Sequence, residues 1–164
     1  MSIAALPLFN ARALDAMSRT GRRTDDLMEC TFPVEGAVGE PLADVDARRV
    51  SHMRRIVVAR LRYLGLVFLL DVAEQIVSEL VTNAVKHGGG EVTLSMRVTR
   101  AAVRLMVRDS GSGQPQPIDP GPEAEGGRGL LIVHLLADER GGESGFDPKT
   151  RTAWCSLPLS QDCP

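Results

Sequence analysis

Aromatic residues are scarce in this sequence: they make up 4% of the 164 residues, with a single tryptophan and a single tyrosine. Hydrophobic residues still account for 43% of the chain. A buried core therefore has to be built mainly from leucine, valine, isoleucine and alanine. The length favours one domain with one core, because a chain of this size is too short for two domains of ordinary size.

The net charge is also small, the cysteines are few and not clustered, and the longest apolar run is interrupted. The net charge of −2 gives no reason to expect direct binding to nucleic acid. Cys30, Cys155 and Cys163 share no metal-like spacing, as expected for a reduced cytoplasmic chain. Residues 56–73 form the longest apolar run, but charged side chains interrupt it, which argues against a membrane span. Residues 3–9 are apolar without a basic segment before them, so no signal peptide is predicted.

The stretch around which the chain is organised runs from Asp71 to His87 and continues into three glycines at 88–90. Asp71 is the expected N-cap of a helix, and the glycines are expected to end it. Apolar residues recur at helical spacing and predict one buried stripe. They are Ala73, Ile76, Val77, Leu80 and Ala84.

Glu79, Asn83 and His87 lie four residues apart, so they share one helix face beside the apolar stripe. The amide oxygen of Asn83, together with nucleotide phosphates, suits Mg²⁺, which prefers oxygen ligands and keeps several waters. The Glu79 carboxylate suits a base that takes a proton from an attacking hydroxyl or water. Taken alone, a glutamate and an asparagine at this spacing are commonplace on a partly solvated helix face, and that interpretation would be favoured.

A second motif, Asp-Ser-Gly-Ser-Gly, begins at Asp109 where a strand-like run ends. A carboxylate at the base of a pocket can accept a hydrogen bond from the exocyclic amine of adenine, where guanine offers a carbonyl. Gly111 and Gly113 allow the backbone to approach a base closely. The alternative is a simple turn between two strands.

A third motif, Gly127-Arg128-Gly129, precedes an apolar helix that starts at Leu130 and is expected to be largely buried. Backbone N–H groups at a helix start favour phosphate oxygens, and Arg128 can contact a terminal phosphate. The alternative is a flexible helix entry. The proline-rich loop at 114–125 before it can form neither a strand interior nor a stable helix.

The remaining pattern predicts an α/β (α+β) two-layer sandwich, with helices on one face of a mixed, mostly antiparallel sheet. A helix is expected over residues 42–64 and a buried one over 130–136. Strands are expected at residues 31–34, 92–99, 103–108 and 152–158. We expect one domain over residues 30–160, between a flexible extension (1–29) and a short tail (161–164).

The three motifs, in this order, resemble the ATP-binding domain shared by DNA gyrase, the Hsp90 chaperone, sensor histidine kinases and the MutL repair protein. Within this GHKL superfamily, the sequence is most similar to the free-standing anti-sigma-factor serine kinases of bacteria. The resemblance covers residues 30–160 and implies the Bergerat ATP-binding fold. It also implies ATP and Mg²⁺ as ligands.

The resemblance assigns roles to the residues of the helix face and of the first glycine motif. Glu79 corresponds to the general base, Asn83 to the Mg²⁺ ligand and Asp109 to the residue that reads adenine. Lys86 and His87 correspond to positions near the phosphates. From the residues alone, both are equally explained as favourable charge at a helix C-terminus.

The resemblance also implies that Gly127, Arg128, Gly129 and Leu130 belong to a mobile lid over the nucleotide. Thr152 corresponds to a threonine that helps to bind adenine. Its alternative role is that of a β-branched strand residue.

The family further implies partners. These are a sigma factor and an anti-anti-sigma protein of the STAS type, phosphorylated on serine or threonine, with a homodimer possible and no nucleic acid or membrane involved. Two alternatives remain open: a nucleotide-sensing module that binds a partner without useful phosphotransfer, and a slow ATPase.

Overall fold

The computed structural model of the chain describes residues 26–112 and 128–160. Its strands form one sheet in the order β1-β2-β3-β5-β4, and each neighbouring pair is antiparallel. The strands are β1 (Asp26–Pro33), β2 (Glu91–Val98), β3 (Ala102–Asp109), β4 (Glu143–Asp147) and β5 (Thr152–Pro158).

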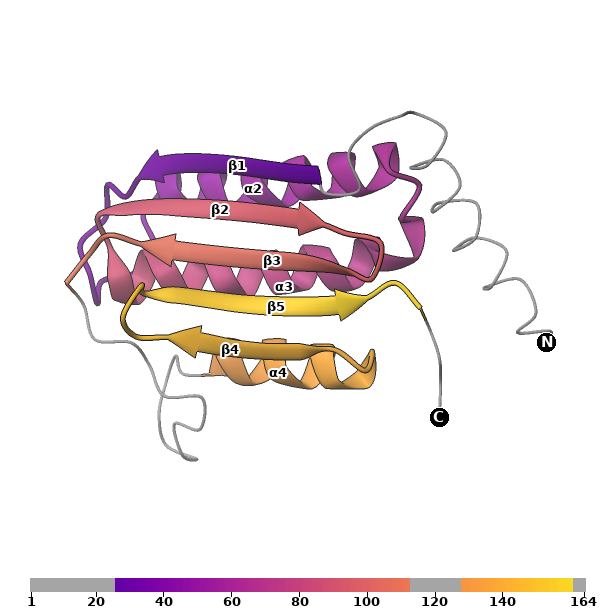
Figure 1. Cartoon of the computed structure of the whole chain (residues 1–164). Coiled ribbons are helices and arrows are strands. Elements are labelled where there is room, and N and C mark those ends of the chain that lie inside the picture. Colours follow the sequence, from indigo (N-terminus) through magenta and orange to yellow (C-terminus); the bar gives the residue numbers. More distant parts are fainter. Residues whose placement is uncertain (1–25, 113–127, 161–164) are drawn as a thin grey trace.

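Three α-helices cover one face of this sheet, as Figure 1 shows, and the other face is not covered by any described element. The helices are α2 (Asp44–Tyr63), α3 (Leu70–Asn83) and α4 (Arg128–Glu139). The predicted two-layer fold class is therefore confirmed, with a described sheet that is wholly antiparallel rather than mixed. None of the described helices combines the length and the apolar character needed to cross a membrane.

The core lies between the sheet and the helices and is aliphatic, as the composition predicts. The predicted stripe of α3 is buried, and so are the inward-facing residues of β2 and β3. One apolar stripe of α2 and its C-cap is buried as well. Its members are Val50, Met53, Val57, Leu61 and Leu64.

One core residue of β5 carries an ionisable group. Cys155 is buried in β5, and burial raises the pKa of its thiol to about 12, so it stays neutral at physiological pH.

On α4, Leu130, Val133 and Ala137 are buried but Leu135 is 53% exposed. The expectation of a largely buried helix is wrong, because α4 lies at the β4 side of the sheet and packs with one face only.

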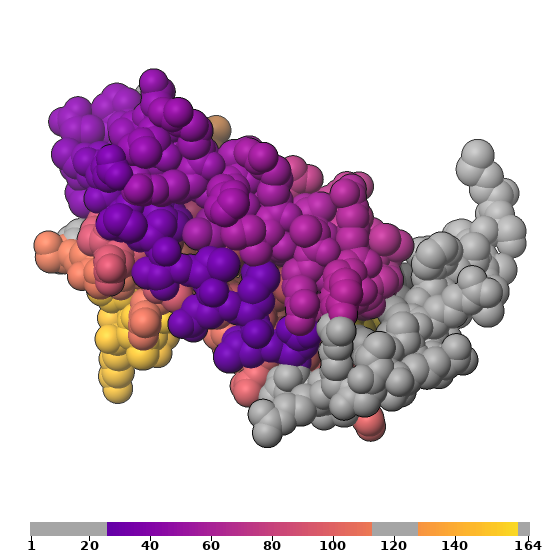
Figure 2. Space-filling view, turned by 90° about the horizontal axis from the view of Figure 1, so that it is seen from above, coloured from indigo at the N-terminus to yellow at the C-terminus, as the bar shows by residue number. Residues whose placement is uncertain are grey.

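Strand β1 begins at Asp26, five residues before the predicted strand start at Thr31. Residues 26–29, which we expected in the flexible extension, pair with β2 in register from Asp26↔Val98 onward. An ion pair between Asp26 and Arg60 of α2 holds this end of the strand. Figure 2, which looks onto this edge of the molecule, shows β1 and α2 side by side.

The central helix differs from its prediction at its start, and it ends at the predicted glycines through a turn that the sequence did not indicate. A 3₁₀ turn, η2 (Val67–Leu69), leads into α3, and no side chain caps the helix, so Asp71 is not its N-cap. Asp71 lies in the first turn, where a carboxylate is favourable for the helix dipole. At the other end the helical path widens into a π-helix, η3 (Ala84–Gly88), closed by the Gly89 N–H, which donates to the Ala84 carbonyl at 3.0 Å.

A buried carboxylate anchors the loop that connects β1 to α2. Asp46 is fully buried and accepts hydrogen bonds from the backbone N–H groups of Glu35 (3.2 Å) and Gly36 (2.8 Å). The same loop reaches the end of the central helix, where the Gly39 N–H donates to the carbonyl of Lys86 at 3.0 Å. Asp46 thus fixes a loop that supports η3.

We expect Asp46→Ala to lower the free energy of unfolding by about 1–3 kcal/mol, because two backbone donors lose their acceptor. Asp44→Ala is the matched control, since Asp44 is exposed in the same helical turn, and it should change stability by about 0.5 kcal/mol or less. Urea unfolding measures both values. Equal effects of the two substitutions would contradict the anchoring role of Asp46.

Candidate functional site

A pocket of about 260 Å³ lies between the C-terminal half of the central helix and the start of α4. Most of its lining residues come from α3 and η3, and three come from α4. They are Glu79, Thr82, Asn83, Lys86, His87, Arg128, Gly129 and Ile132. The structure therefore brings together six residues that the sequence analysis assigned to one site.

The helical path explains how the first five of these side chains converge. Glu79 and Asn83 are separated by one α-helical turn and are both half-buried. The π-helix then carries Lys86 and His87 to the same pocket wall. Single π turns are rare and occur frequently at functional sites, since they re-aim side chains without ending the helix.

Gly129 lets the start of α4 approach this wall. A methyl group at Gly129 would lie 3.0 Å from Oε2 of Glu79, tighter than ordinary van der Waals contact. The first turn of α4 therefore contacts the Glu79 carboxylate directly, and Arg128 at the first helical position adds a fixed positive charge. A side chain at this position would require the Glu79 carboxylate to shift.

The charges of the pocket are mixed and suit a phosphate-bearing ligand. Lys86 and Arg128 provide two cations, and the N-terminus of α4 adds the positive end of a helix dipole. Glu79 provides a single carboxylate that can accept a proton. An anionic ligand with a reacting hydroxyl beside it would find both kinds of group in this pocket.

Asp109 lies at the end of β3, on the face of the sheet that the helices cover, and is only 8% exposed. Its Oδ1 accepts hydrogen bonds from Nε of Arg151 at 2.8 Å and from the backbone N–H of Gly111 at 3.1 Å. Asp109 does not line the pocket, but its carboxylate packs against Gly88, the residue directly after the pocket residue His87. The buried carboxylate and the pocket are therefore neighbours.

Two glycines make the contact at Gly88 possible. A methyl group at Gly88 would lie 2.1 Å from Cγ of Asp109, and one at Gly111 would lie 1.7 Å from the carbonyl oxygen of Gly88. We expected Gly111 to permit a close approach to a base. The close approach that the structure shows is instead between two backbone segments, the end of η3 and the turn after β3.

Thr152 does not join the pocket. It pairs with Arg108 across β3 and β5, so it lies on the sheet face that the helices leave open, opposite to Asp109. Its hydroxyl donates to the carbonyl of Thr150 at 3.3 Å. These positions fit the alternative role of a β-branched strand residue, and they do not support the predicted contact with adenine.

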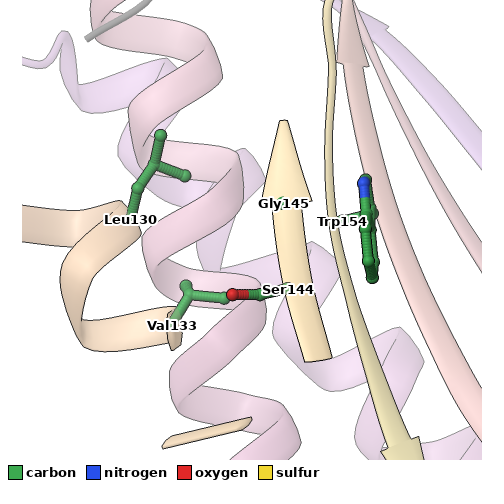
Figure 3. A pocket seen from close by; sticks show the side chains of 5 residues that line it. All are labelled: Leu130, Val133, Ser144, Gly145 and Trp154. Atoms are coloured by element: carbon green, nitrogen blue, oxygen red, sulfur yellow. The ribbon is translucent and has the colours of Figure 1, made fainter. Parts of the chain in front are cut away.

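Leu130 belongs to the core rather than to the pocket wall, because its side chain is 6% exposed. It lines a separate cavity of about 10 Å³, which has room for roughly one water molecule. Figure 3 shows this cavity, with Leu130 and Val133 of α4 across from Gly145 of β4 and Trp154 of β5. Of the other predicted residues, Gly113 and Gly127 lie outside the described residues.

The sequence motifs do not include four residues of this region: Thr82, Ile132, Gly88 and Arg151. Thr82 and Ile132 line the pocket and lie one helical turn from predicted residues, so helical spacing would have found them. Gly88 was interpreted only as a helix end. Arg151 contacts Asp109 across 42 positions of sequence, and no local pattern indicates such a contact.

The donor set fits a magnesium ion that is held together with a nucleotide. Among residues 26–112 and 128–160, no group of three or more histidine, cysteine, aspartate or glutamate side chains could hold a metal ion. Asn83 places one amide group in the pocket wall beside Glu79. Mg²⁺ is usually bound through one or two carboxylates plus substrate phosphates and water. Asn83 offers an amide oxygen in place of a carboxylate, so phosphates and water would supply most of the other ligands.

The fold and the pocket define this chain as an α/β domain whose pocket charges suit an anionic phosphate ligand. Residues 43–148 match the family described as histidine kinase-like ATPase domain. This match covers more than half of the chain, which therefore belongs to that family. Domains of this GHKL type bind ATP, usually with Mg²⁺, and act as kinases or ATPases.

Among solved structures, the chain is similar to the Acinetobacter baumannii histidine kinase AdeS, with 16% sequence identity and a TM-score of 0.44. The similarity covers 94% of this chain and 77% of that one. No curated protein matches the sequence.

The contact between Gly88 and Asp109 leads to a test by a double-mutant cycle. Gly88→Ala should destabilise the fold by about 1–3 kcal/mol, because its methyl group would overlap the Asp109 carboxylate. In an Asp109→Ala background the same change should cost clearly less, since the carboxylate is absent. Thermal unfolding of the four proteins measures the coupling, and a cost that is equal in both backgrounds would contradict the contact.

Proposed function

We propose that the chain is an ATP-dependent protein serine/threonine kinase that acts as an anti-sigma factor. The observation that carries this proposal is the convergence of Glu79, Asn83, Lys86 and Arg128 on one pocket in a histidine kinase-like ATPase domain. The pocket offers a base, a magnesium ligand and two phosphate-binding cations. The buried Asp109 beside it offers an acceptor for adenine.

The size of the pocket supports a proposal for the part of ATP that it would hold. Pockets that enclose a whole small molecule usually measure about 300–1,000 Å³, and this pocket measures about 260 Å³. It therefore suits the phosphates with their metal ion. Asp109 lies beyond Gly88, so the adenine would extend past the end of η3 toward the buried carboxylate.

The reaction follows from the groups that line the pocket. The hydroxyl oxygen of the substrate serine or threonine forms a bond to the γ-phosphorus, the bond to the β-phosphate oxygen breaks, and ADP leaves. Glu79 receives the hydroxyl proton. Lys86 and Arg128 would hold the phosphate oxygens and offset their charge, while Asn83 would hold the magnesium ion. When bound, that ion neutralises charge on the β- and γ-phosphates.

The partners are proposed from the resemblance to bacterial anti-sigma-factor kinases. The substrate would be a STAS-type anti-anti-sigma protein, and the second partner a sigma factor that this chain keeps from RNA polymerase. Phosphorylation of the first partner would control release of the second. The proposal places the protein in the cytoplasm, where both partners act.

Glu79→Gln tests the proposed chemistry. The amide cannot take up the hydroxyl proton, so phosphate transfer from labelled ATP to a STAS-type substrate should fall by about 10²–10⁴-fold. ATP binding, measured by calorimetry, should be retained, since the side chain keeps its size. Glu74→Gln is the matched control, because Glu74 is exposed on the same helix and does not line the pocket.

The outcomes separate the three candidate functions. Unchanged transfer by Glu79→Gln would refute the role of Glu79 as base. Binding of ATP by the wild type without transfer to any STAS protein would favour a nucleotide-sensing module. Release of free phosphate without transfer would favour a slow ATPase.

A further inference from the structure

We propose that Arg151 is a positioning residue that sets the preference of the nucleotide site for adenine over guanine. It does so by holding the Asp109 carboxylate in one orientation. This inference rests on the proposed ATP site and adds to it a residue outside the three motifs and outside the matched family segment, which ends at residue 148.

The contact between the two side chains is short and partly shielded from water. Nε of Arg151 lies 2.8 Å from Oδ1 of Asp109, and the two side chains are 23% and 8% exposed. The Gly111 N–H donates to the same oxygen at 3.1 Å. Both donors therefore hold Oδ1, and neither occupies Oδ2.

Gly88 also restricts the rotation of the Asp109 carboxylate. The backbone of Gly88 approaches the Asp109 carboxylate so closely that an added methyl group would lie 2.4 Å from each oxygen. With Arg151 and Gly111 on Oδ1 and Gly88 packed against the group, rotation of the carboxylate is restricted. The orientation of Oδ2 is thus fixed before a ligand binds.

The backbone at Arg151 supports a specific role for this side chain. Arg151 has a φ of +53°, and among the described residues it is the only non-glycine residue with positive φ. A residue with a Cβ atom is disfavoured in this left-handed region, which glycine adopts without cost. The ion pair with Asp109 offsets that strain, and such strain clusters at ligand-binding sites.

The chemistry of the pair explains the selectivity. A guanidinium group is always charged and only donates hydrogen bonds, so the carboxylate that it faces must act as an acceptor. An acceptor matches the exocyclic amine of adenine and repels the carbonyl oxygen of guanine. Without the guanidinium, Oδ1 would lose one of its two donors, and the carboxylate would be held less firmly in the orientation that presents Oδ2 as an acceptor.

The experiment measures the binding of two non-hydrolysable nucleotides, the imido analogues of ATP and GTP, by calorimetry with Mg²⁺. It compares the wild type with Arg151→Gln, Arg151→Gly and Arg151→Lys. Lys149→Gln is the control, because Lys149 is exposed in the same turn and its removal changes the net charge equally. Melting temperatures of all variants report whether the fold is intact.

We expect the ratio of the two affinities to fall about tenfold in Arg151→Gln and Arg151→Gly, in line with loss of a hydrogen bond to a charged group. Arg151→Lys should recover part of the ratio, and Lys149→Gln should leave it unchanged. Arg151→Gly relieves the backbone strain, so its fold should survive the loss of the ion pair.

Three results would overturn the inference, and they differ in what they say of the proposed function. If the wild type binds the ATP analogue and the ratio stays the same in Arg151→Gln and Arg151→Gly, Arg151 does not set selectivity while the ATP site stands. If the wild type binds neither nucleotide, the ATP site itself fails and the inference fails with it. A fall in both affinities at a constant ratio would assign Arg151 a structural role only.

Discussion

The contact on which this structure depends is the close packing of the end of the central helix against the end of β3. Gly88 and Gly111 allow two backbone segments to meet, and the Asp109 carboxylate fills the space beside them. This packing joins the helix that carries Glu79 and Asn83 to the strand that carries Asp109. A buried carboxylate in this place needs donors, and Arg151 and Gly111 provide them.

The pocket next to this contact brings together charged side chains that add little to the stability of the fold when no ligand is bound. Glu79, Lys86 and Arg128 are brought to one wall by a helix that widens into a π turn and by a second helix that approaches through Gly129. The loop anchored by Asp46 supports the same turn through the hydrogen bond from the Gly39 N–H to the Lys86 carbonyl. Several parts of the chain therefore converge on the last turn of the central helix.

Much of this could be predicted from sequence wherever the signal is local. The apolar stripes of α2 and α3, the alternation in β2 and β3 and the spacing of Glu79 and Asn83 all follow from periods of a few residues. Strand β4 and the first half of β1 were missed, since they contain acidic, glycine or exposed residues and form through pairing with distant strands. The π-helix and the Arg151–Asp109 pair were missed for the same reason, because both depend on tertiary packing.

The central claim is that the buried Asp109 and the neighbouring pocket form one ATP site. Calorimetric titration of the wild type and of Asp109→Asn with ATP and Mg²⁺ tests it most directly. An amide at this position loses the charged acceptor for the adenine amine, so the account predicts micromolar binding by the wild type and a loss of binding by the variant. Absence of binding by the wild type at millimolar ATP, or equal affinity of the two proteins, would contradict it.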